Sequence, residues 1–138
     1  MILYLDFRND TFFFAVIEDK KAKWVTEPGG TSAGGPLAKA FKEFDLLKKK
    51  PNCIALAMGG DMGKRNVSWS TVRAGVATAN ALALAWHIPV ARIHVEGDET
   101  YAVLETLVRE EAKKAKLGEW ASAVYSGEPT ITKAKPLL

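Results

Sequence analysis

Residues 68–93 read SWSTVRAGVATANALALAWHIPVARI, and this stretch decides how the rest of the chain can be arranged. Residues 71–86 are good helix formers or small, and His87 and Pro89 then act as stop signals, so the sequence predicts a helix of about four turns starting at Ser70. One side of this helix would carry Val72, Val76, Ala79 and Ala83, and the opposite side Ala74, Ala77, Ala81 and Leu84.

Both sides of this predicted helix are apolar, whereas a surface helix of a small domain normally has a broad charged face. One side can pack on the protein's own sheet. The other side is so rich in alanine that a second helix could approach closely. We expect that second helix to come from a partner, and the alternative is that the helix over residues 99–116, or the tail, folds back over this side.

Composition indicates one folded domain. The chain has 138 residues and a mass of 15.0 kDa, with 48% hydrophobic and 25% charged residues. The net charge of +3 is mild and the lysines occur in short separate groups, which are typical of solvated faces. The sequence begins directly with a strand pattern and has no long apolar run, so we expect no signal peptide, no membrane contact and a cytoplasmic location.

The remaining elements follow in a simple order. The pattern predicts three antiparallel strands over residues 2–5, 11–17 and 22–26, a helix over 36–48, a buried strand with Cys53 over 53–58, a strand over 90–95 and a helix over 99–116. The first of these helices should bury Leu37, Ala40, Phe41, Phe44 and Leu47, and the last Val103, Leu104, Leu107 and Val108. Gly118 should end the last helix.

The order β-β-β-α-β-α-β-α predicts an α/β protein with a ribonuclease H-like mixed sheet and helices on its faces. The same order forms a single actin-like or Hsp70-like N-terminal lobe. We assign this lobe to residues 1–120. Residues 121–138 are expected to form an extended C-terminal tail, with one possible short strand over 121–125.

Asp6 ends the first predicted strand, where this fold class places a carboxylate that holds a metal ion or orients a phosphate. The next residues, Phe7-Arg8-Asn9, lack the small side chains that let backbone amides approach a phosphate. A turn-forming aspartate is therefore the favoured interpretation. The loop over 59–65 precedes a helix as a P-loop does, but Met58 and Arg65 stand where that motif requires Gly and Ser or Thr.

A nuclease is the alternative function. Asp6 and Asp61, together with Asp98 or Glu96, could converge on divalent metal ions if the strand ends cluster. Three acids in three loops are also what solubility alone would supply. The two histidines, His87 and His94, lack other ligands at metal spacing, and structural roles explain both.

Residues 68–79, SWSTVRAGVATA, resemble the segment S-F-T-G-L-R-I-G-V-A-T-A of the TsaB (YeaZ) family. The following NALALA and Ile88-Pro89-Val90 match it as well. The opening MILYLD resembles the family's start, and YSGEPTITK over residues 125–133 resembles the ending of short members. The resemblance implies the actin-like N-terminal lobe and membership of the bacterial machinery that makes threonylcarbamoyladenosine in transfer RNA.

In that machinery TsaB is a non-catalytic subunit, and two of its helices bundle against those of the catalytic paralogue TsaD, which works with the ATPase TsaE. The family has Asp-Thr-Ser or similar after the first strand, where this chain has Asp6-Phe7-Arg8, and Gly-Pro-Gly where this chain has a longer loop over 59–67. Both departures fall where enzymatic relatives bind a nucleotide. We therefore expect no catalytic residues, cofactor or metal.

The expected function is that of a scaffold or dimerisation subunit for threonylcarbamoyladenosine modification. It would bind a TsaD-like paralogue directly, meet a TsaE-like ATPase indirectly, and contact transfer RNA at most through the complex. A homodimer could form when the partner is absent. The expected partner-binding residues are Leu37, Phe41, Thr78, Ala81 and Ala85. The alternative remains a small nuclease of the Holliday-junction-resolvase type that uses Asp6 and Asp61 with a divalent metal.

Overall fold

The computed structural model describes residues 1–29, 34–59 and 69–121, and the side chains of residues 69–71 are not described. Within these ranges the chain forms five strands and three helices. In chain order they are β1 (Ile2–Asp6), β2 (Thr11–Ile17), β3 (Ala22–Pro28), α1 (Gly34–Phe44), β4 (Cys53–Met58), α2 (Trp69–Trp86), β5 (Val90–His94) and α3 (Tyr101–Lys114). The predicted order of elements is confirmed.

The strands form one mixed sheet in the order β3-β2-β1-β4-β5. β1 pairs antiparallel with β2, which pairs antiparallel with β3, and β4 and β5 add to the other side of β1 as parallel strands. All six residues of β4 are buried because this strand has a neighbour on each side and helices above and below it. The carboxyl ends of β1, β4 and β5 consequently lie along one edge of the molecule.

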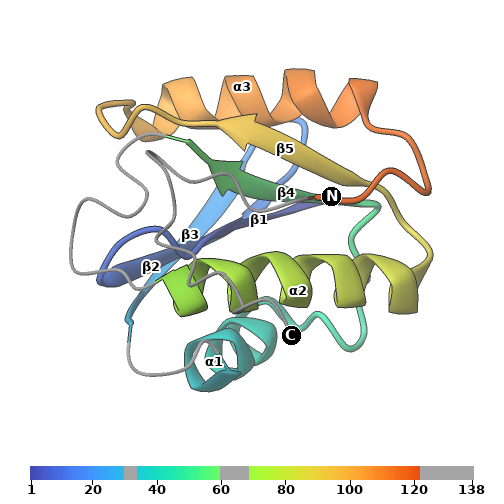
Figure 1. Ribbon diagram of the computed structural model, residues 1–138. Coiled ribbons are helices and arrows are strands. Elements are labelled where there is room, and N and C mark those ends of the chain that lie inside the picture. The colour runs from blue at the N-terminus through green and yellow to red at the C-terminus, as the bar shows by residue number, and fades with distance from the viewer. Residues whose placement is uncertain (30–33, 60–68, 122–138) are drawn as a thin grey trace, which may run out of the picture.

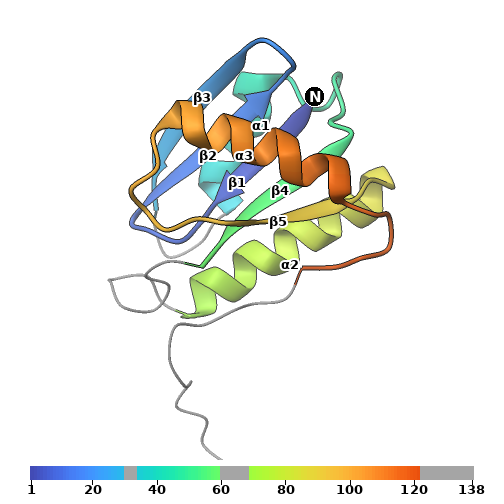
Figure 2. The ribbon, with the colours of Figure 1, turned by 90° about the horizontal axis from the view of Figure 1, so that it is seen from above.

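The molecule has three layers (Figures 1 and 2). α3 lies on one face of the sheet, over β1, β4 and β5, while α1 and α2 lie side by side on the other face. α1 contacts β2 and β3, and α2 contacts β4 and β5. The α3 residues therefore do not cover α2. The alternative in which the helix after β5 folds over the alanine-rich side of α2 is wrong.

α2 buries the side that the sequence predicts. Val72, Ala79 and Ala83 are buried against the sheet, and Val76 is partly buried. The helix ends where His87 adopts a left-handed φ of 57°. The N–H of His87 then donates to the carbonyl of Leu84, and the N–H of Ile88 donates to that of Ala83. These two bonds form a Schellman motif with histidine in place of the usual glycine, which explains the predicted stop.

α1 is shorter than the predicted 36–48 helix. Asp45 takes a left-handed φ of 56°, which ends the helix at Phe44, and the N–H of Leu46 returns to the carbonyl of Phe41 at 3.0 Å. The turn buries Leu46 and leaves Leu47 84% exposed, so the prediction that Leu47 belongs to the core is wrong. Lys48, Lys49 and Lys50 therefore lie beyond the end of α1 and are exposed.

α3 also begins and ends inside its predicted range. Thr100 caps it by accepting the N–H of Val103, and Leu104 and Val108 are buried while Val103 is 51% exposed. The helix ends at Lys114, four residues before the predicted stop at Gly118. The chain then passes the β5 edge of the sheet and reaches α2 (Figure 2).

The connection after α3 is fixed to α2 by one side chain. Asn80 donates from Nδ2 to the carbonyl of Ala121 at 2.9 Å, and its Oδ1 accepts the Ala121 N–H at 3.0 Å. Ala121 is buried, so the first residue of the expected tail is held in the core. The rest of the tail, including residues 122–125 of the possible strand over 121–125, lies outside the described residues.

Two further expectations concern the burial of Cys53 and the presence of a membrane-spanning helix. Cys53 is buried in β4, and burial raises the pKa of its thiol to about 11, as predicted for a core cysteine. None of the described helices is both long enough and apolar enough to cross a membrane.

Candidate functional site

Asp6 and Arg8 form a buried ion pair at the carboxyl end of β1. The guanidinium Nε lies 2.9 Å from Asp6 Oδ1, and Nη2 lies 2.9 Å from Oδ2, so the contact is a two-point fork. The backbone N–H of Arg8 also donates to Asp6 Oδ1 at 3.0 Å. This last bond is the turn-forming role predicted for Asp6 and is confirmed, but the side-chain fork was not predicted.

The remaining arm of Arg8 ties together the ends of neighbouring strands. Its Nη1 donates to the carbonyl of Gly59, after β4, at 3.2 Å and to that of Val95, after β5, at 3.1 Å. Burial by itself lowers the pKa of Arg8, but the hydrogen bonds and charge of Asp6 outweigh it and raise that pKa. A permanent cation therefore lies among the oxygens at the carboxyl ends of the strands, where open α/β sheets bind their ligands.

Phe7 fills the space between this turn and α2. Its ring is 2% exposed and meets Phe12 and Phe14 edge to face, with ring centroids 5.1 and 5.4 Å apart. A Cβ placed on Gly75 of α2 would lie 2.6 Å from the Phe7 ring, so only glycine permits this approach. The space left between Phe7, Arg8 and α2 is about 10 Å³. This crevice cannot hold a phosphate as it stands.

A larger cavity lies beside the ion pair, on the α3 face of the sheet. Its volume is about 180 Å³, and it is lined by aromatic side chains, by the Asp6–Arg8 pair and by Glu99. Its full lining comprises Tyr4, Asp6, Arg8, Asn9, Phe13, Trp24, Val95, Gly97, Glu99, Tyr101 and Leu104. Burial raises the pKa of the Tyr4 hydroxyl, and the negative charge of Asp6 raises it further, so this hydroxyl stays protonated.

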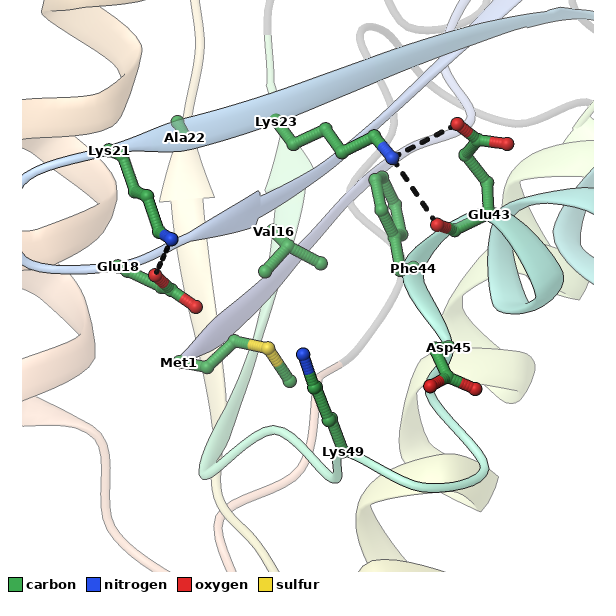
Figure 3. A pocket seen from close by; sticks show the side chains of 10 residues that line it. All are labelled: Met1, Val16, Glu18, Lys21, Ala22, Lys23, Glu43, Phe44, Asp45 and Lys49. Atoms are coloured by element: carbon green, nitrogen blue, oxygen red, sulfur yellow. Dashed lines mark hydrogen bonds and ion pairs between the residues drawn. The ribbon is translucent and has the colours of Figure 1, made fainter.

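Another hollow, of about 340 Å³, lies at the opposite end of the sheet, between the start of β3 and the end of α1 (Figure 3). Its floor is apolar, and its charged rim is largely paired. Lys23 Nζ lies 3.0 Å from Glu43 Oε1, and Lys21 Nζ lies 3.4 Å from Glu18 Oε2 (Figure 3). The Lys23–Glu43 contact joins β3 to α1, so we interpret this hollow as part of the packing of α1.

The expected partner-binding residues fall into two groups. Ala81 and Ala85 are exposed on α2. Leu37 and Phe41 instead pack partly buried against the core, and the Phe41 ring stacks on Trp86 with centroids 5.6 Å apart. Thr78 is partly buried and donates from Oγ1 to the Ala74 carbonyl at 2.6 Å. Their role in partner binding stays a prediction.

Exposed apolar residues nevertheless form a continuous stripe on α2, which we call the outer face of α2. It consists of Ala74, Ala77, Ala81, Leu84 and Ala85. Leu84 is 67% exposed and is the largest apolar side chain of this stripe. Within the described part of the chain, α3 lies on the far side of the sheet and leaves this stripe uncovered.

The acids of the nuclease alternative are not brought together in the described residues. Both oxygens of Asp6 face Arg8, and Asp61 lies outside the described residues, as does the rest of its loop. Glu96 pairs with His94 at 2.8 Å on the surface, and Asp98 is exposed. Among the residues that the structure describes, no group of three or more metal-binding side chains forms.

The strand order, the connections and the placement of the helices define the class of the fold. The described residues form a ribonuclease H-like mixed α/β sheet, the fold of one actin-like lobe. Comparisons with protein-family models and with curated proteins found no match.

Solved structures do match. The structure resembles YeaZ from Pseudomonas aeruginosa, with a TM-score of 0.51 and 18% identity over 67% of this chain and 43% of that one. A structure described as an uncharacterized protein with similarity to peptidase YEAZ, from the same organism, matches with a TM-score of 0.51 and 18% identity, over 67% of this chain and 42% of that one. This chain thus matches less than half of either structure. RuvC from T. thermophilus in complex with a Holliday junction substrate matches with a TM-score of 0.48 and 17% identity, over 88% of this chain and 82% of that one. The similarities to the two Pseudomonas aeruginosa structures show a YeaZ-like fold.

Proposed function

We propose that this protein is a non-catalytic scaffold subunit for threonylcarbamoyladenosine modification of transfer RNA, and that it binds a TsaD-like catalytic paralogue through α1 and α2. The observation that carries the proposal is the exposed outer face of α2 in a YeaZ-like fold. Small side chains let a second pair of helices approach closely, and Leu84 would supply an apolar anchor. A standard interface buries roughly 800 Å² on each partner, which two helices of this length can provide.

The strand ends support a non-catalytic role. In an α/β enzyme the crevice outside the carboxyl ends of the strands is where ligands bind. Here Phe7 fills the side of that crevice next to α2, and the Arg8 guanidinium takes up the oxygens of Asp6. The same contacts weigh against the nuclease alternative, because a carboxylate held in a two-point fork would have to lose that partner before it could bind a metal ion.

Ala81→Glu tests the interface. Because Ala81 is exposed in the free protein, the glutamate side chain should change the unfolding temperature little. In the complex the same side chain would be buried between helices, so partner binding should weaken by at least tenfold. The matched control is Ala102→Glu, an exposed alanine on α3 on the other side of the sheet. Tagged protein purified from the native cell should retain a TsaD-like paralogue, identified by mass spectrometry, in the parent and in the control only.

Two results would contradict the proposal. One is a parent protein that brings down no TsaD-like paralogue, and the other is an Ala81→Glu variant that binds that paralogue as tightly as the parent does. Loss of the gene should also lower the threonylcarbamoyladenosine content of transfer RNA, measured by nucleoside mass spectrometry. If the content is unchanged although the paralogue binds, the protein binds the paralogue without serving the modification.

A further inference from the structure

The outer edge of β3 is the feature that the scaffold function leaves unused. β3 is the last strand at its end of the sheet, and within the described part of the chain it pairs with β2 alone. We infer that this edge pairs with β3 of a second copy of the chain, antiparallel about a two-fold axis, so that the two sheets become continuous. α2 lies over β4 and β5 at the other end of the sheet, so this contact is separate from the outer face of α2 and does not depend on the proposed scaffold function.

Alternate residues of β3 direct their backbone groups away from β2. Just beyond one end of the β2–β3 ladder the N–H of Gly29 donates to the carbonyl of Asp10, and just beyond the other the N–H of Glu18 donates to that of Lys21. In the continued register each donor lies directly opposite its acceptor. Such pairs alternate along an antiparallel ladder with pairs that share no hydrogen bond. The outward backbone groups therefore belong to the residues between, which are Ala22, Trp24, Thr26 and, with a carbonyl only, Pro28.

One register pairs all seven residues of β3 with the same seven residues of a second copy. It is centred on Val25. Trp24 of one copy then lies opposite Thr26 of the other, and both direct their backbone groups outward, as an antiparallel ladder requires. At the strand ends Ala22 lies opposite Pro28. The missing N–H of proline removes one bond at each end, so about six backbone hydrogen bonds join the two copies.

The charges of β3 match in the same register. Lys23 of one copy lies opposite Glu27 of the other, and the two-fold axis repeats this contact. Both contacts are pairs without backbone hydrogen bonds, in which the side chains lie closest. Within its own copy Lys23 Nζ lies 3.0 Å from Glu43 Oε1. Glu27 Oε2 lies 3.6 Å from Lys39 Nζ. The two copies would thus extend these contacts into a row in which the signs alternate.

The opposite edge of the sheet shows how such pairing is avoided. Arg92 is exposed in the middle of β5, so a two-fold pair centred on this strand would bring two arginines face to face. The chain after α3 also passes this edge (Figure 2). The centre of β3 instead consists of Trp24, Val25 and Thr26, which are residue types that favour strands. A lysine at a strand edge discourages pairing with an unrelated strand, so Lys23 also favours a second copy over other partners.

Sedimentation equilibrium of the full chain between about 5 and 500 µM tests the inference. We expect a reversible equilibrium between monomer and dimer with Kd on the order of 100 µM, because two seven-residue strands bury less area than a standard interface. Amide hydrogen exchange locates the contact. The amides of Trp24 and Thr26 should exchange more slowly as the concentration rises, whereas that of Val25, which faces β2, should be protected throughout.

Charge variants test the register. Lys23→Glu and Glu27→Lys each bring like charges together at both ends of the strand pair, so each alone should weaken dimerisation about tenfold. A mixture of the two variants should form a mixed dimer with an affinity within about threefold of the parent's, because every contact then joins opposite charges again. The matched controls are Lys113→Glu and Glu110→Lys, which change the net charge equally at exposed positions of α3 and should dimerise like the parent.

A backbone variant separates pairing from folding. Thr26→Pro removes an outward N–H but no bond to β2, so the monomer should stay folded while dimerisation weakens at least about tenfold. Thr26→Val keeps the N–H and should dimerise like the parent. If Glu27→Lys does not fold, the two Thr26 variants decide.

Three results would overturn the inference. The first is a parent chain that stays monomeric at about 500 µM. The second is a mixture of the two charge variants that stays monomeric although both are folded. The third is a dimer that Ala81→Glu abolishes and Thr26→Pro does not, which would place the contact on α2.

Discussion

Arg8→Met is the most informative change to the strand ends. It keeps a long side chain but removes the guanidinium, so the carboxylate of Asp6, which is 4% exposed, loses its charged partner, and the carbonyls of Gly59 and Val95 lose their donor. Among the described residues, the backbone N–H of Arg8 at 3.0 Å and the more distant Tyr4 hydroxyl at 3.5 Å are the donors that remain beside Asp6. The variant leaves a buried charge without compensation.

The magnitude follows from this count of lost partners. Removing one member of a buried ion pair costs about 3–5 kcal/mol, and each unsatisfied carbonyl adds about 1–3 kcal/mol, less where water can enter. We expect a loss of about 5 kcal/mol in the free energy of unfolding, the lower end of that sum because Gly59 is partly exposed and water can reach its carbonyl. Urea titration followed by circular dichroism measures it. The expected loss is a large share of the 5–15 kcal/mol that is typical of a folded domain.

Two companion variants isolate the cause. Asp6→Asn combined with Arg8→Met should be more stable than Arg8→Met alone, because the double variant buries no unpaired charge. Arg8→Lys should fall between parent and Arg8→Met, since lysine keeps the charge but cannot form the two-point fork. A loss below about 1 kcal/mol for Arg8→Met, or a double variant less stable than the single one, would refute the reasoning.

Two further predictions concern the core. Gly75→Ala should lower the free energy of unfolding by about 1 kcal/mol. Crowding against the Phe7 ring costs about 1–3 kcal/mol, while the gain in helix propensity returns about 1 kcal/mol. Urea titration measures this free energy, and a variant more stable than the parent would contradict the close contact. Cys53 should react with thiol reagents near neutral pH only as fast as the protein unfolds, and rapid labelling would contradict its burial. Because the pKa of this thiol rises from 9.0 to about 11 on folding, the unfolded thiol ionises first, and stability should fall as pH rises between these values.

Local patterns predicted most of the fold. The ranges 11–17 and 53–58 coincide with β2 and β4, and the apolar side of α2 faces the sheet as expected. The wrong predictions occur where the conformation of one residue ends an element that the apolar pattern would continue. Asp45 ends α1 in a left-handed conformation that is usual for glycine, so the leucine stripe could not reveal the turn.

The site was less accessible to sequence reasoning. The turn role of Asp6 depends on its near neighbours and was predicted, whereas the two backbone carbonyls that Arg8 binds lie 51 and 87 residues away in sequence. The clasp between Asn80 and Ala121 spans 41 residues and was missed for the same reason. The one available signal was Asn80 itself, a polar residue at the edge of an otherwise apolar helix. That signal did not indicate which residue Asn80 would bind.

That clasp also sets the order in which the molecule can be completed during synthesis. Ribosomes add about 5–20 residues each second, so the 41 residues that separate Asn80 from Ala121 take about 2–8 s to make. During this interval the α2 sequence exists, but the backbone groups that satisfy its asparagine do not. An α2 that has already formed therefore presents the unpaired side-chain amide of Asn80 to the surrounding medium for several seconds, and a chaperone or an early-binding subunit would meet it in that state.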